Sequence, residues 1–290
     1  MSLEQEFGKL DNRIDRLLNN SEKEIGKKYA VMLRELRHKV SDFFSEYADG
    51  DDALTLQTMQ KYNRLDKFNK EITEIARKSY TPVAREMRKG IRSSLTTSFD
   101  QTTGAVGEAA GKTIRGTLKP ETVNEIVQTP HSGLKLNERL QRRRADVVGR
   151  IQETLVRGMN QGERYSTMAN RLKDELEGDA RKAERIIRTE GHRVAEEGKR
   201  KAVEHATKQG VKMKKTWKSS GDERVRGAPG GKYPDAIAKH HLMDGQTVDT
   251  DEDFYNEYTG GSGPTPGQLG VAEDDIFCRC LAIYEVVEVE

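Results

Sequence analysis

Two cysteines and a histidine in the last third of the chain have the residue types of a metal site. Cys278 and Cys280 are separated by one residue, and His240 lies upstream of them. If residues 276–284 form a strand, both sulfur atoms point to the same face, because side chains alternate along a strand. Two thiolates and an imidazole are ligands that tetrahedral Zn²⁺ prefers. The alternative is a pair of ordinary thiols in a small packed core.

A structural metal would suit this part of the chain. The segment after Gly210 holds four of the seven prolines and few large apolar residues, so it can bury little surface of its own. A structural zinc contributes on the order of 10 kcal/mol of folding free energy in small domains. We expect zinc here, with Asp222 or His241 as the fourth ligand. The spacing of the two cysteines fits a disulfide poorly.

Charged residues also occur on an apolar helical stripe. Glu190 and Arg193 share a face with Ile186 in a helical pattern, and buried charges need partners. We expect both to pack against the C-terminal segment, with Asp222, Arg224 or Arg226 as partners. A structural role is favoured over catalysis, because the nearby sequence supplies no nucleophile with a base.

Arginines are dense on two predicted helices, over residues 134–158 and 179–209. Such a surface can contact DNA phosphates without reading sequence, although neighbouring glutamates leave an ordinary solvated face as the alternative. The candidate nucleic-acid contacts are Arg139, Arg142, Arg143, Arg144, Arg150, Arg181 and Arg185.

The elements that position these residues are mainly helical. Apolar residues step by three and four over residues 3–47, which predicts one long amphipathic helix or two in line, and residues 48–52 read as a turn. A second helical pattern runs from residue 54 to about residue 92, with Pro82 as a break or kink. Residues 1–95 are therefore predicted to form a helical hairpin.

The rest of the chain divides into three further segments. Residues 96–118 are rich in Thr, Gly and Ala and are predicted to be a flexible joint. Residues 119–210 form a helical domain, with separate helices over 163–177 and 179–209. Residues 211–290 form a loop-rich module with short strands at 212–218 and 276–289. The predicted fold class is mainly α with a small C-terminal α+β module.

Composition and charge narrow the function. Of the 290 residues, 34% are hydrophobic and 34% are charged, which argues against a large buried sheet, and no stretch is apolar enough to span a membrane. Residues 221–290 hold 5 Lys or Arg and 15 Asp or Glu, a net charge of −10. Since the whole chain has a net charge of +2, the first 220 residues carry +12. A basic front half makes nucleic acid a candidate partner, and packing of the two halves on each other is the alternative.

Several pieces of the last third occur in an order that resembles the phage Mu F-like minor head proteins, also called the head morphogenesis family. The resemblance covers about residues 180–282. This chain departs from the family at residues 227–239, which are an insertion, and at Phe277, where the family usually has Asn. The pieces are Arg188, Thr189, Glu190 and Arg193, then Trp217, Asp222, Arg224 and Arg226, then His240 with Asp244 and Gly245, Phe254, and finally Cys278 and Cys280.

The resemblance implies a non-enzymatic virion protein. Such a protein belongs to the phage head, is assembled in the bacterial host cytoplasm, and acts at the portal vertex in procapsid assembly and in packaging or ejection of DNA. The implied partners are the portal protein, coat or scaffolding protein, and double-stranded DNA without sequence specificity. The alternative is a metal-dependent hydrolase or toxin-like enzyme that uses the C-terminal site. A coiled-coil adaptor unrelated to phage would explain the front half but not the ordered C-terminal motifs.

Overall fold

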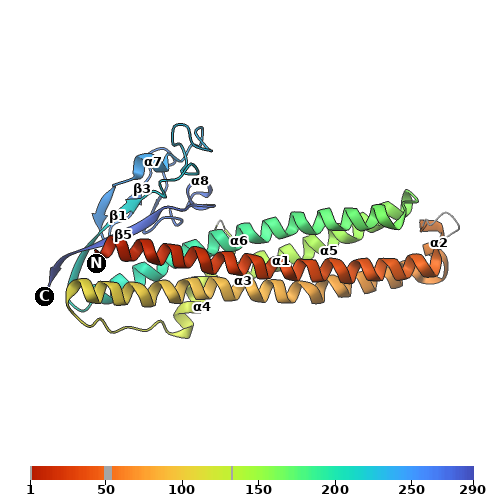
Figure 1. The fold of residues 1–290 in the computed structure, drawn as a ribbon, viewed down its shortest axis with the longest axis horizontal. Coiled ribbons are helices and arrows are strands. Elements are labelled where there is room, and N and C mark those ends of the chain that lie inside the picture. The colour runs from red at the N-terminus through yellow and green to blue at the C-terminus, as the bar shows by residue number, and fades with distance from the viewer. Residues whose placement is uncertain (1, 49–53, 132) are drawn as a thin grey trace. The chain divides into compact units, whose positions relative to one another are not determined.

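Long helices dominate the computed structural model, which describes residues 2–48, 54–131 and 133–290. The predicted turn at residues 48–52 lies largely outside these residues. Figure 1 shows the order of the elements, from α1 in red to β5 in blue. The helices are α1 (Leu3–Tyr47), α2 (Leu56–Gln60), a 3₁₀ turn (Lys61–Asn63), α3 (Arg64–Ala110), α4 (Pro120–Gln128), α5 (Leu136–Asn160), α6 (Tyr165–Thr207), α7 (His240–Met243) and α8 (Ala272–Asp275).

Short strands make up the sheets, and all of them follow α6. β1 (Val211–Lys218) is the central strand of an antiparallel sheet, between β2 (Thr247–Asp249) and β5 (Leu281–Val289). In the register of β1 and β5, Trp217 lies opposite Ala282. A second antiparallel pair joins β3 (Phe254–Tyr255) to β4 (Ser262–Gly263). This arrangement confirms the predicted fold class of a mainly α protein with a small C-terminal α+β module.

The chain forms two compact units that do not follow its linear order. One unit comprises residues 1–20, 89–136 and 185–290, and the other comprises residues 21–88 and 137–184. The sequence predicted a different division at residues 95, 118 and 210. The difference arises because α1, α3 and α6 each supply residues to both units, and a long helix gives no compositional sign of where its packing partners change.

The apolar stripe of α1 explains its continuity. Phe7, Leu10 and Ile14 are buried, and the same rhythm continues from Ile25 to Phe43. Between these two stretches, Leu18 takes the buried position rather than the predicted Leu17. One uninterrupted helix therefore forms over Leu3–Tyr47.

α3 corrects two predictions, a break at Pro82 and a flexible joint after residue 95. A kink at Pro82, the other alternative, stays a prediction. The helix runs through Pro82 without ending, although proline removes one backbone hydrogen bond, because Tyr80, Val83 and Met87 beside it are buried. It also continues to Ala110, so residues 96–110 of the predicted flexible joint are helical. Only residues 111–118 of that segment lie outside a helix.

Close packing against α6 explains why the Thr, Gly and Ala segment is ordered. The Ser98 hydroxyl donates to the Ala195 carbonyl at 2.6 Å, and Phe99 is buried. A Cβ atom at Gly198 would lie 2.6 Å from the Leu95 carbonyl oxygen, so only glycine allows this approach. Small residues here permit contact between helix backbones, whereas the sequence analysis took them as a sign of flexibility.

α6 is also one helix where two were predicted. It passes through Gly178 without interruption and ends at Thr207, and Gly210 adopts a φ of 84° in the turn before β1. Within the unit of residues 21–88 and 137–184, the buried Asp179 carboxylate accepts hydrogen bonds from Tyr29, Arg143 and Arg150. This carboxylate links α1, α5 and α6 in that unit.

We predict that Asp179→Ala lowers the free energy of unfolding by about 3 kcal/mol, because it leaves two arginines without their shared buried partner. Chemical denaturation of the full chain would measure the change. Asp174→Ala, at an exposed position of the same helix, is the matched control and should change stability by less than about 0.5 kcal/mol. Equal effects of the two substitutions would contradict this role for Asp179.

Candidate metal centre

His240, Cys278 and Cys280 converge at the C-terminal module. Their possible ligand atoms lie within 4.8 Å of one another, and the His240 Nδ1 atom lies 3.9 Å from Cys278 Sγ and 3.5 Å from Cys280 Sγ. The three residues are only 2%, 4% and 3% exposed. The predicted convergence of these three residues is therefore present in the structure.

The backbone that brings the sulfur atoms together is not the predicted strand. β5 begins at Leu281, so both cysteines precede it, in a segment that follows α8. Phe277 has a φ of 59°, a left-handed conformation that is unusual for a bulky side chain. The turn at Phe277, rather than strand alternation, directs the two cysteines toward His240.

Asp274 is a functional residue that the sequence analysis missed. Its Oδ1 atom lies 3.0 Å from His240 Nε2, on the opposite side of the ring from the sulfur atoms. Asn256 donates to the same oxygen at 2.7 Å, and the Thr259 hydroxyl donates to Oδ2. The sequence offered no specific signal for this residue, because it is one of 15 acidic residues in the last 70.

The electrostatics of the cluster follow from these contacts. Burial lowers the pKa of His240, but hydrogen bonds with Asp274 and Cys278 outweigh burial and raise it to about 9. The hydrogen bond with Cys280, together with that of His240, holds the pKa of Cys278 well below its usual value despite burial. The same contact with Cys278, together with burial, raises the pKa of Cys280. The pKa values of the two neighbouring thiols are therefore shifted in opposite directions by the hydrogen bond that they share.

The predicted fourth ligands lie elsewhere. The Asp222 carboxylate pairs with the Arg224 guanidinium at 2.6 Å and lies 3.5 Å from that of Arg279. The His241 Nδ1 atom lies 3.3 Å from the carbonyl oxygen of Arg226. Within the described residues, the group able to share an ion consists of the histidine and the two cysteines. Neither Asp222 nor His241, the two expected fourth ligands, belongs to this group, and each contacts a different partner.

The geometry fits a tetrahedral metal. With Zn–S bonds of about 2.3 Å and a Zn–N bond of about 2.1 Å, tetrahedral angles place N and S ligand atoms roughly 3.6 Å apart. The two observed N to S distances of 3.9 and 3.5 Å bracket this value. Imidazole and thiolate are also a donor set that Zn²⁺ prefers. The three side chains could therefore hold a metal ion.

The motif residues Glu190 and Arg193 of α6 are buried as predicted, but Arg193 has other hydrogen-bond partners than those predicted. Glu190 and Arg193 are buried and pair with each other at 3.0 Å, and Arg193 also donates to the Ile126 carbonyl of α4. The predicted burial is present, but the contacts of Arg193 are not with Asp222, Arg224 or Arg226. Thr189 accepts a hydrogen bond from the Phe277 amide at 3.4 Å, which links α6 to the turn beside the cysteines.

Other motif residues hold the loops around the cluster. Arg226 donates to the carbonyl oxygens of Asp274 and Ile276, the residues on either side of the end of α8. The Trp217 ring packs edge-on against His240, with 5.4 Å between centroids. The Asp244 carboxylate accepts from the Ser219 amide, and Arg188 pairs with Asp15 of α1 at 3.1 Å. The scattered motifs thus build one neighbourhood around the His and Cys side chains.

The arginines predicted to contact nucleic acid differ in their exposure and in their ion pairs. Arg143 and Arg150 are engaged by Asp179, and Arg139 is half-buried, so these three are poorly placed as phosphate contacts. The candidates with exposed side chains are Arg142, Arg144, Arg181 and Arg185.

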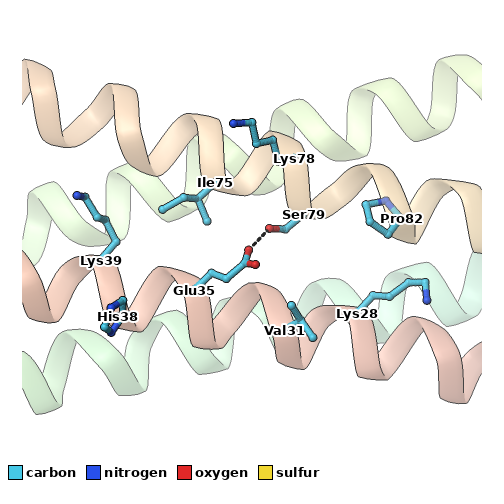
Figure 2. Close-up of a pocket in the computed structure, with 9 residues that line it drawn as sticks. All are labelled: Lys28, Val31, Glu35, His38, Lys39, Ile75, Lys78, Ser79 and Pro82. Carbon is cyan, nitrogen blue, oxygen red and sulfur yellow. Dashed lines mark hydrogen bonds between the residues drawn. The ribbon is translucent and has the colours of Figure 1, made fainter.

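A groove of about 540 Å³ between α1 and α3 is a second candidate site. Figure 2 shows its apolar residues Val31, Ile75 and Pro82, with the Ser79 hydroxyl donating to Glu35 at 2.6 Å across the middle. The basic side chains along its edges each lie near a carboxylate, in the pairs Lys28–Glu24, Lys39–Glu71, Lys78–Glu74 and His38–Asp42. This internal pairing makes the groove a feature of helix packing rather than a polar binding site.

The fold and site define a helical protein whose C-terminal module encloses a buried His, Cys and Cys cluster. Residues 149–283 match the family described as Phage Mu protein F like protein. The chain is 29% identical over 278 residues to the Minor head protein GP7 of Bacillus phage SPP1, covering 96% of this chain and 86% of that protein. These two matches support the Mu F-like minor head protein family, which the motif order resembled, and a location in the phage head.

A second relative has a different name. The chain is 31% identical over 171 residues to the NAD(+)–arginine ADP-ribosyltransferase EFV of Enterococcus faecalis (strain ATCC 700802 / V583), covering 59% of this chain and 32% of that protein. No solved structure matches the chain significantly. Within the described residues, none of the helices is both long and apolar enough to cross a membrane.

The positive φ of Phe277 gives a testable consequence. Asn adopts the left-handed region more readily than a bulky residue, so Phe277→Asn should raise the free energy of unfolding by about 0.5 to 1 kcal/mol. Part of the gain is offset by loss of the Arg185 guanidinium stacked 5.3 Å from the Phe277 ring. Thermal and chemical denaturation of the full chain would measure the change.

Tyr258→Asn is the matched control for this substitution. Tyr258 is 45% exposed against 46% for Phe277, and its φ is not positive. The control should bring no gain in stability. A loss of stability in Phe277→Asn equal to that of the control would contradict the role assigned to backbone strain.

Proposed function

We propose that this chain is a minor component of the phage head that acts at the portal vertex in procapsid assembly and in packaging or ejection of DNA. The observation that carries this proposal is the match to a minor head protein over 96% of the chain. Assembly takes place in the host cytoplasm, and the partners are the portal protein and the coat or scaffolding protein. The long helices with exposed polar faces supply docking surfaces for such partners.

Co-purification with the portal protein of the same phage tests the proposal. We expect the full chain to co-elute with the portal oligomer in size-exclusion chromatography, and not with an unrelated ring-shaped protein of similar size. Elution of a folded chain on its own in both mixtures would contradict an action at the portal vertex. Circular dichroism would confirm that the helices are intact in the sample.

DNA contact is proposed to use the exposed arginines of α5 and α6. Phosphate contacts release counterions, so affinity should fall steeply with salt and should not depend on sequence. We predict that Arg142→Gln, Arg144→Gln, Arg181→Gln and Arg185→Gln combined reduce the slope of log affinity against log salt by up to about 0.9 for each contact removed. Fluorescence anisotropy with two unrelated duplexes would measure it.

A charge-matched control distinguishes DNA binding by the arginines of α5 and α6 from a general effect of the total positive charge. Lys27, Arg34, Lys67 and Lys70 are exposed basic residues on α1 and α3, and their combined change to Gln removes the same four charges. The control should retain nearly the wild-type salt dependence. Equal losses in the two variants would show that DNA binding is not located on α5 and α6.

The cluster of His240, Cys278 and Cys280 is proposed to hold a structural zinc. Zinc would join the start of α7 to the segment before β5, in a module whose own core is small. The complete burial of the three side chains supports a structural role over the alternative of a hydrolase or toxin-like enzyme, because a substrate needs access to the reacting atoms. The partial match to an ADP-ribosyltransferase covers 32% of that enzyme, and it is the observation that keeps the alternative open.

We predict one bound zinc per chain, measured by elemental analysis of the purified protein. Chelator should lower the melting temperature of the wild type but not that of the Cys278→Ser, Cys280→Ser double variant. Co²⁺ should quench the fluorescence of Trp217, the single tryptophan, which packs against His240. His241→Ala is the matched control and should behave as the wild type. A wild-type protein without metal that is indifferent to zinc and chelator would contradict the site.

A further inference from the structure

We propose that Asp274 is the positioning residue of the metal centre, and that it fixes His240 so that Nδ1 is the metal-binding nitrogen. This inference rests on the proposed metal site and goes beyond it, since it assigns the ligand atom and a residue outside the ligand set. A metal-binding histidine commonly donates its other ring N–H to a carboxylate, which fixes the tautomer and the orientation of the ring.

The two ring nitrogens of His240 face different chemistry. Nε2 lies 3.0 Å from the Asp274 carboxylate, whereas Nδ1 faces the sulfur atoms at 3.9 and 3.5 Å. A half-turn of the ring about the Cβ–Cγ bond would place the carbon atoms Cδ2 and Cε1 where Nδ1 and Nε2 now lie, so the sulfur contacts and the hydrogen bond with the buried carboxylate would both be lost. Because a buried carboxylate without its partner is costly, the observed orientation is strongly favoured.

Asp274 is itself held in place, which a positioning residue requires. Asn256 donates to its Oδ1 atom at 2.7 Å, and Thr259 donates to its Oδ2 atom. Gly261 permits this close approach, because a Cβ atom there would meet Asp274 Oδ2 and a methyl group of Val271. The loop that follows β3 therefore encloses the carboxylate on the side away from His240.

The backbone of Asp274 is also restrained, by Arg226. The Arg226 guanidinium donates one hydrogen bond to the Asp274 carbonyl oxygen at 2.8 Å and another to the Ile276 carbonyl oxygen. The same arginine thus fixes the end of α8, from which the chain turns at Phe277 into the two cysteines. The hydrogen-bond acceptor and the two sulfur atoms are consequently carried by one short segment, Asp274 to Cys280.

Metal titration of the full chain tests this assignment. We expect Asp274→Asn to weaken Zn²⁺ affinity by 10- to 100-fold, measured by competition with a chromophoric chelator. Asp275→Asn is the matched control: Asp275 is adjacent and buried, but its carboxylate accepts from the amides of Leu269 and Gly270 instead of contacting His240. The control should lower affinity by well under about 10-fold, the lower limit for loss of a hydrogen-bond partner of a metal-binding histidine. Asn256→Ala, which leaves the carboxylate in place, covers the case in which Asp274→Asn does not fold.

A spectroscopic readout separates positioning from a general loss of stability. In protein with ¹⁵N-labelled histidine and bound ¹¹³Cd²⁺, we expect coupling between cadmium and His240 Nδ1. Coupling to Nε2, or an unchanged affinity of a folded Asp274→Asn variant, would overturn the inference while leaving the metal site intact. A wild-type chain that binds neither Zn²⁺ nor Cd²⁺ would overturn the metal site together with this assignment.

Discussion

The hydrogen bond between the buried Asp274 carboxylate and His240 is the interaction on which the C-terminal module depends. Three loops meet there, since Asn256 and Thr259 bind the carboxylate and His240 begins α7. The module buries a small set of large apolar side chains, among them Trp217, Phe254 and Tyr284, but much of its length is loop. Polar contacts between its loops add to that core, and a bound metal would add to them.

The same principle explains how α6 carries the module. The Glu196 carboxylate accepts from the Ala282 amide at 2.8 Å and pairs with Lys199 at 2.6 Å, and all three residues are buried. The Thr189 hydroxyl accepts a hydrogen bond from the Phe277 amide, directly before the first of the two cysteines. A buried threonine and a buried glutamate on one helix thus anchor the cysteine segment and the start of β5, respectively. Such pairs contribute geometry more than net stability, because desolvation offsets much of their attraction.

Burial of the cluster also helps to choose between a structural metal centre and an enzyme active site. The Cys278 thiol of lowered pKa, His240 and Asp274 would be a nucleophile, a base and an orienting carboxylate, respectively, if substrate could reach them. Their burial among Trp217 and the surrounding loops favours a structural centre instead. The similarity to a minor head protein over nearly the whole chain agrees with that reading.

The sequence determined those features that depend on local pattern. The stepping of apolar residues predicted α1, the shift to glycine and proline after Gly210 predicted the small module, and the order of motifs predicted the family. Residue type pointed to Cys278 and Cys280 as candidate metal ligands, because few other side chains can bind a soft metal ion, and the family resemblance pointed to His240 rather than His241. These inferences need no knowledge of long-range packing, because helical periodicity depends on the order of nearby residues and ligand chemistry depends on residue type.

Only the tertiary structure decided which groups meet. Residues 96–110 are helical because they pack closely on α6, a contact with a segment about a hundred residues away that their own composition does not reveal. Asp222 and Asp274 look alike in sequence, yet Arg224 and Arg279 engage the first while the second faces His240. Arg143 and Arg150 were indistinguishable from Arg142 and Arg144 until Asp179 was found beside them. Partner choice among like charges is fixed by long-range packing, and a single sequence carries no local record of it.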